Sequence, residues 1–381
     1  MRLPPITTAE VTRSLARAAA VMALAAAPAL ANAAPTLSLL DLGSGVSFLN
    51  VTQRGETLAV GGGLMAGRTQ AGDAFAGTLG ARRDGVIGMA GNGGLGFAAT
   101  DVIGAPPAVD TASAAAQDFS RRGGVAQSAG FLVGVNTAGG LTYVEAGTDT
   151  PFTTSSVGGL FSLGSDLVNF NLGAGQGLFG QDSILGAGPV QGLIGTTTDG
   201  RLRLLRTDGQ TGSASMVSRQ LGFAADTGLA VVGGFVVGVN AQGSVNVYEP
   251  LFDLLFEDVG PAGLFSLMGG MAALDFGSFV RDDLFDLTGD VLGSQGVLGI
   301  SATGGLAYLR LDVIPGDRAS AAHAVLRGDV GLNLDLDSGL ALDNGFVTAM
   351  SAADDRQSVP EPGTALLVAV AGLAGLASRR R

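Results

Sequence analysis

Short apolar runs that end in glycine recur along the chain, and each is followed by a second strand-like run. Five segments share this form: Gly85–Ala99, Phe131–Glu145, Gly192–Arg206, Phe235–Glu249 and Gly296–Arg310. In each of them an x-Gly pair separates the two runs, and glycine supplies the positive φ angle that a tight hairpin turn requires. In Arg201–Arg206, leucine and arginine alternate, as in a strand with one buried face. The pattern therefore predicts five β-hairpins.

The hairpins repeat at a fixed distance. Phe131–Glu145 aligns with Phe235–Glu249, and Gly192–Arg206 aligns with Gly296–Arg310, both without gaps and at the same offset of 104 residues. Two hairpins in each such unit leave about 52 residues per hairpin, close to the roughly 40–50 residues of a four-stranded propeller blade. The sequence predicts an all-β fold of repeated antiparallel hairpins, a β-propeller of about six blades being favoured. A β-sandwich is the alternative, and a β-solenoid comes third.

Few segments have a helical pattern. Thr111–Arg122 and Asp317–Arg327 combine alanines with polar residues, and Asp317 could serve as an N-cap. We expect both to form short connecting helices.

The N-terminus has the pattern of an export signal. Arg2, Arg13 and Arg17 are basic, Ala18–Leu30 is apolar, and Ala31-Asn32-Ala33 follows the small-residue rule for cleavage. We therefore expect a signal peptide over residues 1–33, cleaved by signal peptidase after Ala33.

The C-terminus has a second, independent pattern. A Pro-Glu-Pro tripeptide, an uncharged apolar run and a basic end follow one another, formed by Pro360, Glu361 and Pro362, by Gly363–Ser378, and by Arg379, Arg380 and Arg381. The apolar run would make a helix of roughly 24 Å, short for a hydrocarbon core of about 30 Å but tolerable at modest cost. The arginines would stay on the cytoplasmic side. This predicts a C-terminal transmembrane helix with the body exported.

This order of features resembles the PEP-CTERM sorting signal of Gram-negative bacteria. The resemblance implies processing by exosortase, a membrane-embedded transpeptidase-like protease, and an inner-membrane-tethered precursor that reaches the cell surface or the extracellular space. It covers only the C-terminal tag, so it says nothing about the body. The resulting division is a signal peptide at 1–33, a repeat-built all-β domain at 34–350, a linker at 351–359 and a sorting signal at 360–381.

Composition narrows the function classes. The formal net charge is −12, and the body becomes more acidic without the two terminal signals, which carry six of the 21 basic residues, so nucleic acid is not expected as a partner. Cys is absent and a single His is present, which excludes Cys-ligated zinc, iron–sulfur clusters and His-rich metal sites. Trp is also absent, so aromatic platforms for sugars are scarce.

Candidate catalytic groups are sparse. His323 is the only histidine, and no G-x-S-x-G elbow accompanies it. The pairs Glu257-Asp258 and Asp282-Asp283 could serve glycoside hydrolysis if two carboxylates met in a cleft, but solvated loop charges are the default interpretation. Tyr143, Tyr248 and Tyr308 are interpreted as packing residues. The sequence therefore predicts no catalytic site, no cofactor and no enzyme activity.

One acidic stretch suggests a cation. In GLNLDLDSGLALDNG, polar side chains alternate with leucines, which would place Asp335 and Asp337 on one face of a strand that turns toward Asp343. Oxygen ligands of this kind can hold calcium weakly, so Asp335, Asp337 and Asp343 are the calcium candidates. An ordinary amphipathic hairpin is the competing interpretation.

These observations predict an exported cell-envelope or extracellular-matrix protein, structural or adhesive in an exopolysaccharide or biofilm context, with exopolysaccharide as a candidate partner. The alternative is a secreted protein that binds or degrades polysaccharide through a propeller face. The biofilm association follows from the sorting-signal resemblance alone.

Overall fold

The computed structural model describes residues 35–54, 58–59, 61–71, 74–104, 107–113, 118–128, 131–145, 151–153, 158–172, 190–206, 216–250, 253–275, 295–311, 323–325, 331–343 and 345–351. The predicted signal peptide at 1–33 and sorting signal at 360–381 lie outside these residues, as does the predicted linker apart from Ser351. None of the helices within the described ranges is long and apolar enough to cross a membrane.

Four-stranded antiparallel units in chain order make up most of the fold. Blade 1 contains β3 (Leu64–Arg68), β4 (Asp84–Met89), β5 (Leu95–Ala99) and β6 (Ala108–Ser113). Blade 2 contains β7 (Val125–Ser128), β8 (Phe131–Val135), β9 (Leu141–Glu145) and β10 (Pro151–Thr153). Blade 3 contains β11 (Val168–Leu172), β12 (Val190–Thr196), β13 (Arg201–Arg206) and β14 (Met216–Gln220).

The remaining blades complete the set. Blade 4 contains β15 (Leu229–Val232), β16 (Phe235–Val239), β17 (Val245–Glu249) and β18 (Leu254–Val259). Blade 5 contains β19 (Met271–Asp275), β20 (Gln295–Ile300), β21 (Leu306–Arg310) and β22 (His323–Val325). Blade 6 combines β23 (Leu340–Asp343) and β24 (Phe346–Met350) with β1 (Thr36–Asp41) and β2 (Ser47–Arg54).

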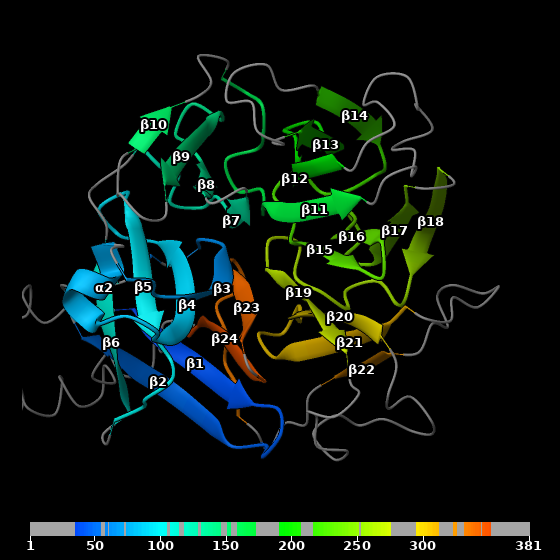
Figure 1. Ribbon diagram of the computed structural model, residues 1–381. Coiled ribbons are helices and arrows are strands. Elements are labelled where there is room, and N and C mark those ends of the chain that lie inside the picture. The colour runs from blue at the N-terminus through cyan, green and yellow to red at the C-terminus, as the bar shows by residue number, and fades with distance from the viewer. Residues whose placement is uncertain are drawn as a thin grey trace, which may run out of the picture. The chain divides into compact units, whose positions relative to one another are not determined.

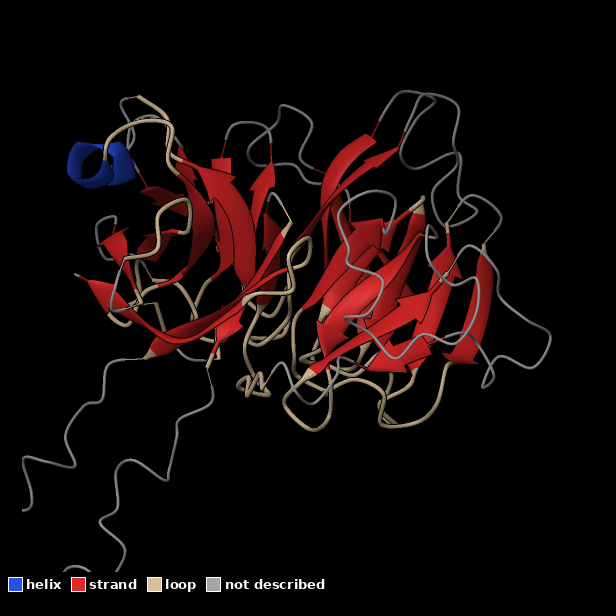
Figure 2. Cartoon of the chain, turned by 90° about the horizontal axis from the view of Figure 1, so that it is seen from below, coloured by secondary structure: helices blue, strands red, loops and turns tan. Residues whose placement is uncertain are grey.

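The first strands of the blades close a ring. β3 contacts β7, and the contacts continue through β11, β15, β19 and β23 back to β3. In Figure 1 these six strands surround the centre, whereas the later strands of each blade lie farther out. Figure 2 shows that strands account for nearly all of the regular structure. The fold is a six-bladed β-propeller, which confirms the favoured prediction over the sandwich and the solenoid.

The five predicted hairpins are the second and third strands of blades 1 to 5, so the 104-residue offset spans two blades. Each x-Gly turn has its glycine at positive φ: 83° at Gly93, 73° at Gly139, 73° at Gly200, 74° at Gly243 and 84° at Gly304. The positive φ predicted for the five turn glycines is confirmed.

Blade 6 has no hairpin copy in the sequence because its middle strands come from the two ends of the chain. β24 pairs antiparallel with β1, and Leu37 lies opposite Met350. At the outer edge, β2 also pairs in parallel with β6 of blade 1. The ring is therefore closed by joining the first and last strands of the domain.

Both predicted helices are wrong where they can be compared. Residues of Thr111–Arg122 extend β6, which pairs with β5, and Phe119 then forms an isolated bridge with Asn136. His323 lies in β22, and the rest of Asp317–Arg327 falls largely outside the described residues. Pairing with a neighbouring strand outweighed local helix propensity. The described helix is instead α2 (Ala74–Leu79), where Phe75 packs on Phe97 with ring centroids 5.6 Å apart.

A large apolar residue precedes the inner strand of every blade, at Leu58, Phe119, Phe161, Phe223, Phe265 and Leu334. Its side chain packs on the glycine that ends the apolar run of a hairpin. A Cβ added to Gly134 would lie 2.7 Å from the Phe119 ring, and one added to Gly299 would lie 2.6 Å from Phe265. In blades 2 to 5 this glycine thus makes room for an aromatic ring, whereas Leu58 takes that place in blade 1.

Candidate functional site

The backbones of all six blades meet at the axis of the propeller. We use the name axial ring for the residues at equivalent positions just before the inner strands: Gly63, Gly124, Asp166, Gly228, Gly270 and Gly339. Backbone hydrogen bonds join consecutive blades here, from Gly63 N to Gly123 O (3.2 Å), Gly124 N to Ser165 O (2.8 Å), Asp166 N to Thr227 O (3.5 Å), Gly270 N to Ser338 O (2.8 Å) and Gly339 N to Gly62 O (2.8 Å).

Glycine is required in this ring because the next blade leaves no room for a side chain. A Cβ at Gly339 would lie 2.1 Å from Leu64 N, and one at Gly270 would lie 2.2 Å from Leu340 N. These contacts are with backbone, which cannot move aside without opening the ring.

Asp166 is the exception in the axial ring. Its carboxylate accepts hydrogen bonds from the backbone N–H groups of Leu229 and Met271, which belong to blades 4 and 5. A Cβ built on Gly63 would lie 2.7 Å from Asp166 Oδ1, so the carboxylate also approaches blade 1. Burial raises the pKa of Asp166 from 3.8 to about 7, against the lowering effect of the two backbone donors.

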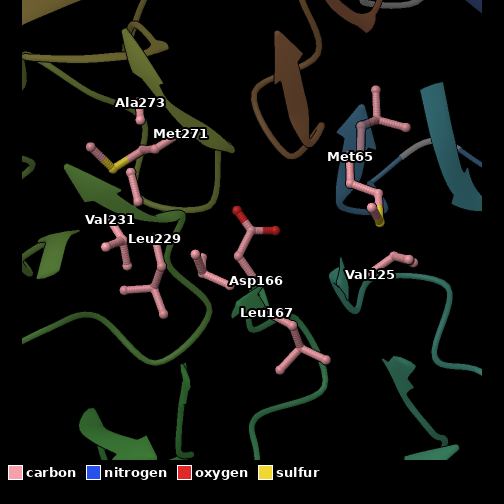
Figure 3. A pocket seen from close by; sticks show the side chains of 11 residues that line it. Met65, Val125, Asp166, Leu167, Leu229, Val231, Met271 and Ala273 are labelled. Carbon is pink, nitrogen blue, oxygen red and sulfur yellow. The ribbon is translucent and has the colours of Figure 1, made fainter. Parts of the chain in front are cut away.

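A cavity of about 160 Å³ lies beside this carboxylate, and we call it the axial cavity. It is lined by Leu64, Met65, Val125, Asp166, Leu167, Val168, Leu229, Ala230, Val231, Met271 and Ala273. Figure 3 shows the Asp166 carboxylate pointing into the middle of these side chains. Asp166 is half-buried, because its side chain faces this space.

A second, much smaller hollow of about 10 Å³ is lined by Gly61, Arg122, Gly164, Asp226, Met268 and Asp337. Each of these residues lies two positions before an axial-ring residue. Arg122 and Asp337 form an ion pair at 3.9 Å, and Asp226 accepts hydrogen bonds from the Ser162 hydroxyl and from Gly164 N. This hollow is too small for an organic ligand, so the axial cavity is the better candidate site.

The calcium candidates do not come together. Asp335 begins a turn, in which its carboxylate accepts the N–H of Asp337 at 3.2 Å, whereas Asp343 ends β23. The predicted strand through Asp335 and Asp337 is therefore wrong, because only Leu334 makes a β-bridge there. Burial raises the pKa of Asp343, and the nearby Asp84 adds to that rise. Across the described ranges, no three Asp, Glu or His side chains gather as metal ligands.

The other predicted candidates have structural surroundings. Asp258 accepts a hydrogen bond from Asn240 Nδ2 at 2.8 Å, while Asp282-Asp283 lies outside the described residues. His323 is exposed on the outer strand of blade 5. Tyr143, Tyr248 and Tyr308 are all buried, as expected of packing residues.

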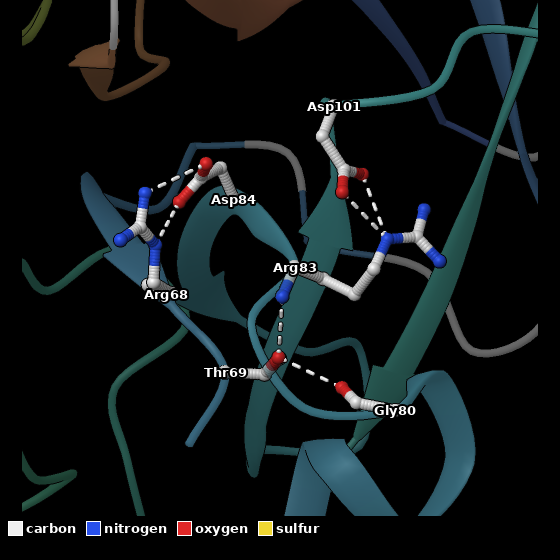
Figure 4. Close-up of polar contacts among 6 residues, drawn as sticks. All are labelled: Arg68, Thr69, Gly80, Arg83, Asp84 and Asp101. Carbon is white, nitrogen blue, oxygen red and sulfur yellow. Dashed lines mark hydrogen bonds and ion pairs between the residues drawn. The ribbon is translucent and has the colours of Figure 1, made fainter.

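A polar cluster links the end of β3 to the start of β4 in blade 1 (Figure 4). Arg68 forms a bidentate ion pair with Asp84, and this hydrogen bonding holds the pKa of Asp84 below its usual value. Arg83 Nε donates to Asp101 at 2.7 Å, and its backbone N–H donates to Thr69. Every member of the cluster has a protein partner, so it is a structural feature and not a second site.

Sequence reasoning missed Asp166. The available signal was the segment before each inner strand, in which a large apolar residue is followed five positions later by glycine in five blades and by aspartate in one. The sequence GLFSL occurs twice in this repeat, at Gly159–Leu163 and Gly263–Leu267. Extending this alignment would have matched Asp166 to Gly270.

The fold and the site define this chain as a six-bladed β-propeller in which Asp166 places a carboxylate in the axial ring. Residues 358–381 match the family described as the PEP-CTERM protein-sorting motif, which confirms the resemblance found in the tail. The motif marks an exported protein that is sorted by exosortase and passes through the membrane to the cell surface. The family match does not extend to the propeller.

Solved structures of low identity are similar to the chain. A fungal lectin from Aleuria aurantia with a six-bladed β-propeller fold and a fucose recognition mode is 13% identical, with 75% of this chain and 86% of that chain covered and a TM-score of 0.44. BamB from Moraxella catarrhalis is 14% identical, with 80% and 86% covered and a TM-score of 0.35. No curated protein matches the sequence. At these TM-scores the fold assignment rests on strand pairing alone.

Proposed function

We propose that this chain is an envelope or extracellular-matrix protein whose propeller acts as a structural or adhesive module, delivered by signal peptidase and exosortase. It works by binding, with exopolysaccharide as its partner, and not by catalysis. The sorting motif at residues 358–381 supports the route, and the acidic net charge of −12 suits a secreted protein rather than a nucleic-acid binder.

The observation that carries this proposal is the closure of blade 6. Leu37 at the start of the domain pairs with Met350 at its end, and Ser351 N donates to Thr36 O at 2.9 Å. The first and last strands of the described domain, β1 and β24, thus lie side by side in one blade. Both signals can be processed without removing a strand from any blade, so the propeller can be displayed intact.

The sorting step is tested by replacing Pro360, Glu361 and Pro362 with alanine in the native host. We expect the variant to keep its tail and remain in the membrane fraction, measured by intact mass and by fractionation. Pro261→Ala, in the connection between β18 and β19, is the control and should be processed normally. A triple variant with the mass and distribution of the unaltered protein would contradict the proposal.

The matrix role is tested by deleting the gene and measuring surface attachment and the exopolysaccharide retained by the cells. We expect both to fall and to recover when the unaltered chain is restored. Release of reducing ends from purified exopolysaccharide by the protein would instead favour the degrading alternative.

A further inference from the structure

The carboxylate of Asp166 occupies a place where an ionised group is costly. Five of the six blades put glycine at this position, and the ring needs no side chain there to close. An ionised carboxylate removed from water costs several kcal/mol unless it gains a counter-charge. The two backbone N–H donors, Leu229 and Met271, offset only part of this cost.

The axial cavity itself supplies no counter-charge. Its other ten lining residues are all leucine, valine, alanine or methionine, contributed by β3, β7, β11, β15 and β19 or by the residues directly before them. None of these ten side chains is titratable or charged, so the lining gives the Asp166 carboxylate no positive partner, and a bound cation would supply one.

The same lining selects the kind of cation. Calcium binds six to eight oxygen ligands and magnesium demands an octahedral set, whereas this cavity offers one carboxylate. Two of the groups that face the carboxylate are N–H donors, which repel a metal ion. An organic ammonium ion, in contrast, needs one carboxylate for its charge and apolar walls for its carbon chain.

We propose that the axial cavity binds a small primary alkylammonium compound, with its ammonium group on the Asp166 carboxylate and its carbon chain toward the less buried lining residues Met65, Val168, Val231 and Ala273. This binding is independent of the proposed matrix role.

Size and access fit such a ligand. A volume of about 160 Å³ is similar to apolar cavities of about 150 Å³ that hold a benzene-sized molecule, which corresponds to a chain of about four to six carbons. Leu229 and Met271 near the ring are buried, whereas Ala273, farther along β19, is exposed. The lining is therefore more exposed toward the far ends of the inner strands than near the axial ring.

The test uses the full chain in nonionic detergent with n-butylammonium chloride as the probe and n-butanol as its neutral counterpart, and binding is followed by ligand-observed NMR at pH 8. We expect saturable binding of n-butylammonium that is at least about tenfold tighter than that of n-butanol, since a hydrogen bond to a charged group contributes roughly that much. Lowering the pH to 5 should weaken n-butylammonium binding and leave n-butanol unchanged.

Three variants separate the carboxylate from general effects. Asp166→Asn keeps the volume and Asp166→Gly installs the residue of the other five blades, and both should bind n-butylammonium at least about tenfold more weakly. Asp110→Asn removes one carboxylate from outer strand β6 and should bind like the unaltered chain. Circular dichroism confirms folding, and either Asp166 variant suffices if the other fails to fold.

Three results would overturn the proposal. The first is no saturable binding of n-butylammonium to the unaltered chain, and the second is undiminished binding to a folded Asp166 variant. The third is displacement of n-butylammonium by calcium chloride at equal or lower concentration, with no such displacement by sodium chloride of the same ionic strength.

Discussion

Blade 3 and the other five blades place different residues at the same point of the axial ring. The five glycines let neighbouring backbones touch, with inter-blade hydrogen bonds of 2.8–3.2 Å donated by four of them, whereas the bond donated by Asp166 N is 3.5 Å long. At this one position blade 3 places a carboxylate beside the axial cavity, where the other blades place glycine.

Replacing Gly339 by alanine should have the largest effect on this comparison. The new Cβ would lie 2.1 Å from Leu64 N and 2.5 Å from Gly63 Cα, and only an opened ring could relieve these contacts. We expect a loss of at least about 4 kcal/mol in the free energy of unfolding, measured by denaturant titration. Gly77→Ala in α2, where nothing lies within 4 Å, is the control and should be neutral or stabilising. An unchanged midpoint for Gly339→Ala would show that the ring is not closed.

Asp166→Asn should have the next largest effect, and it should depend on pH. The pKa of Asp166 is raised from 3.8 to about 7 by burial, so the folded state resists ionisation and the unfolded state does not. The contribution of Asp166 is therefore most favourable below about pH 4 and is lost progressively as the pH rises to about 7. The variant should gain about 4 kcal/mol relative to the unaltered chain between pH 4 and pH 8. A gap that stays constant over this range would mean that the carboxyl titrates normally.

Blades 1 to 5 share the x-Gly turn, so substitutions at these turns test the repeated part of the fold. Gly200 has φ of 73°, and a Cβ there would lie 2.5 Å from Phe223 O, so Gly200→Val should cost roughly 1–3 kcal/mol. Gly93→Ala should cost about 1 kcal/mol because Gly93 has φ of 83°. Gly91→Ala, in the same turn but with open space and no positive φ, should be silent by thermal unfolding. Equal effects at Gly91 and Gly93 would remove positive φ as the explanation.

The ion pair of the small hollow should matter least. Arg122 and Asp337 are 3.9 Å apart, and the Arg122 side chain is 64% exposed. Arg122→Ala should therefore change the free energy of unfolding by less than about 0.5 kcal/mol. A larger loss in denaturant titration would mean that this side of the axis helps to hold the ring.

Much of the fold could be predicted because it repeats. The five hairpins share one sequence pattern. Each turn requires a positive φ and therefore a glycine, and that glycine is visible in the sequence. The number of blades could be predicted, but the strands of the sixth blade could not be assigned, since β24 and β1 lie at opposite ends of the chain. The helix predicted at Thr111–Arg122 failed because pairing with β5 decides that segment, and pairing is a long-range property.

The site could not be predicted in the same way. Asp166 lies in a short irregular segment without periodicity, and its burial arises only when the inner strands of several blades close around it. Asp335, Asp337 and Asp343 carried a visible alternation, yet Asp335 and Asp337 precede β23 and Asp343 ends it. Sequence alternation showed which residues are polar, while ring closure decided which of them are enclosed.

The most direct test is the pH titration of the Asp166 carboxyl carbon by NMR in the full chain with labelled aspartate, assigned with Asp166→Asn. The account predicts a midpoint near pH 7, raised by burial, that moves to lower pH when n-butylammonium chloride is added, because the bound ammonium stabilises the carboxylate. A midpoint near pH 4, or one that n-butylammonium does not move, would contradict it.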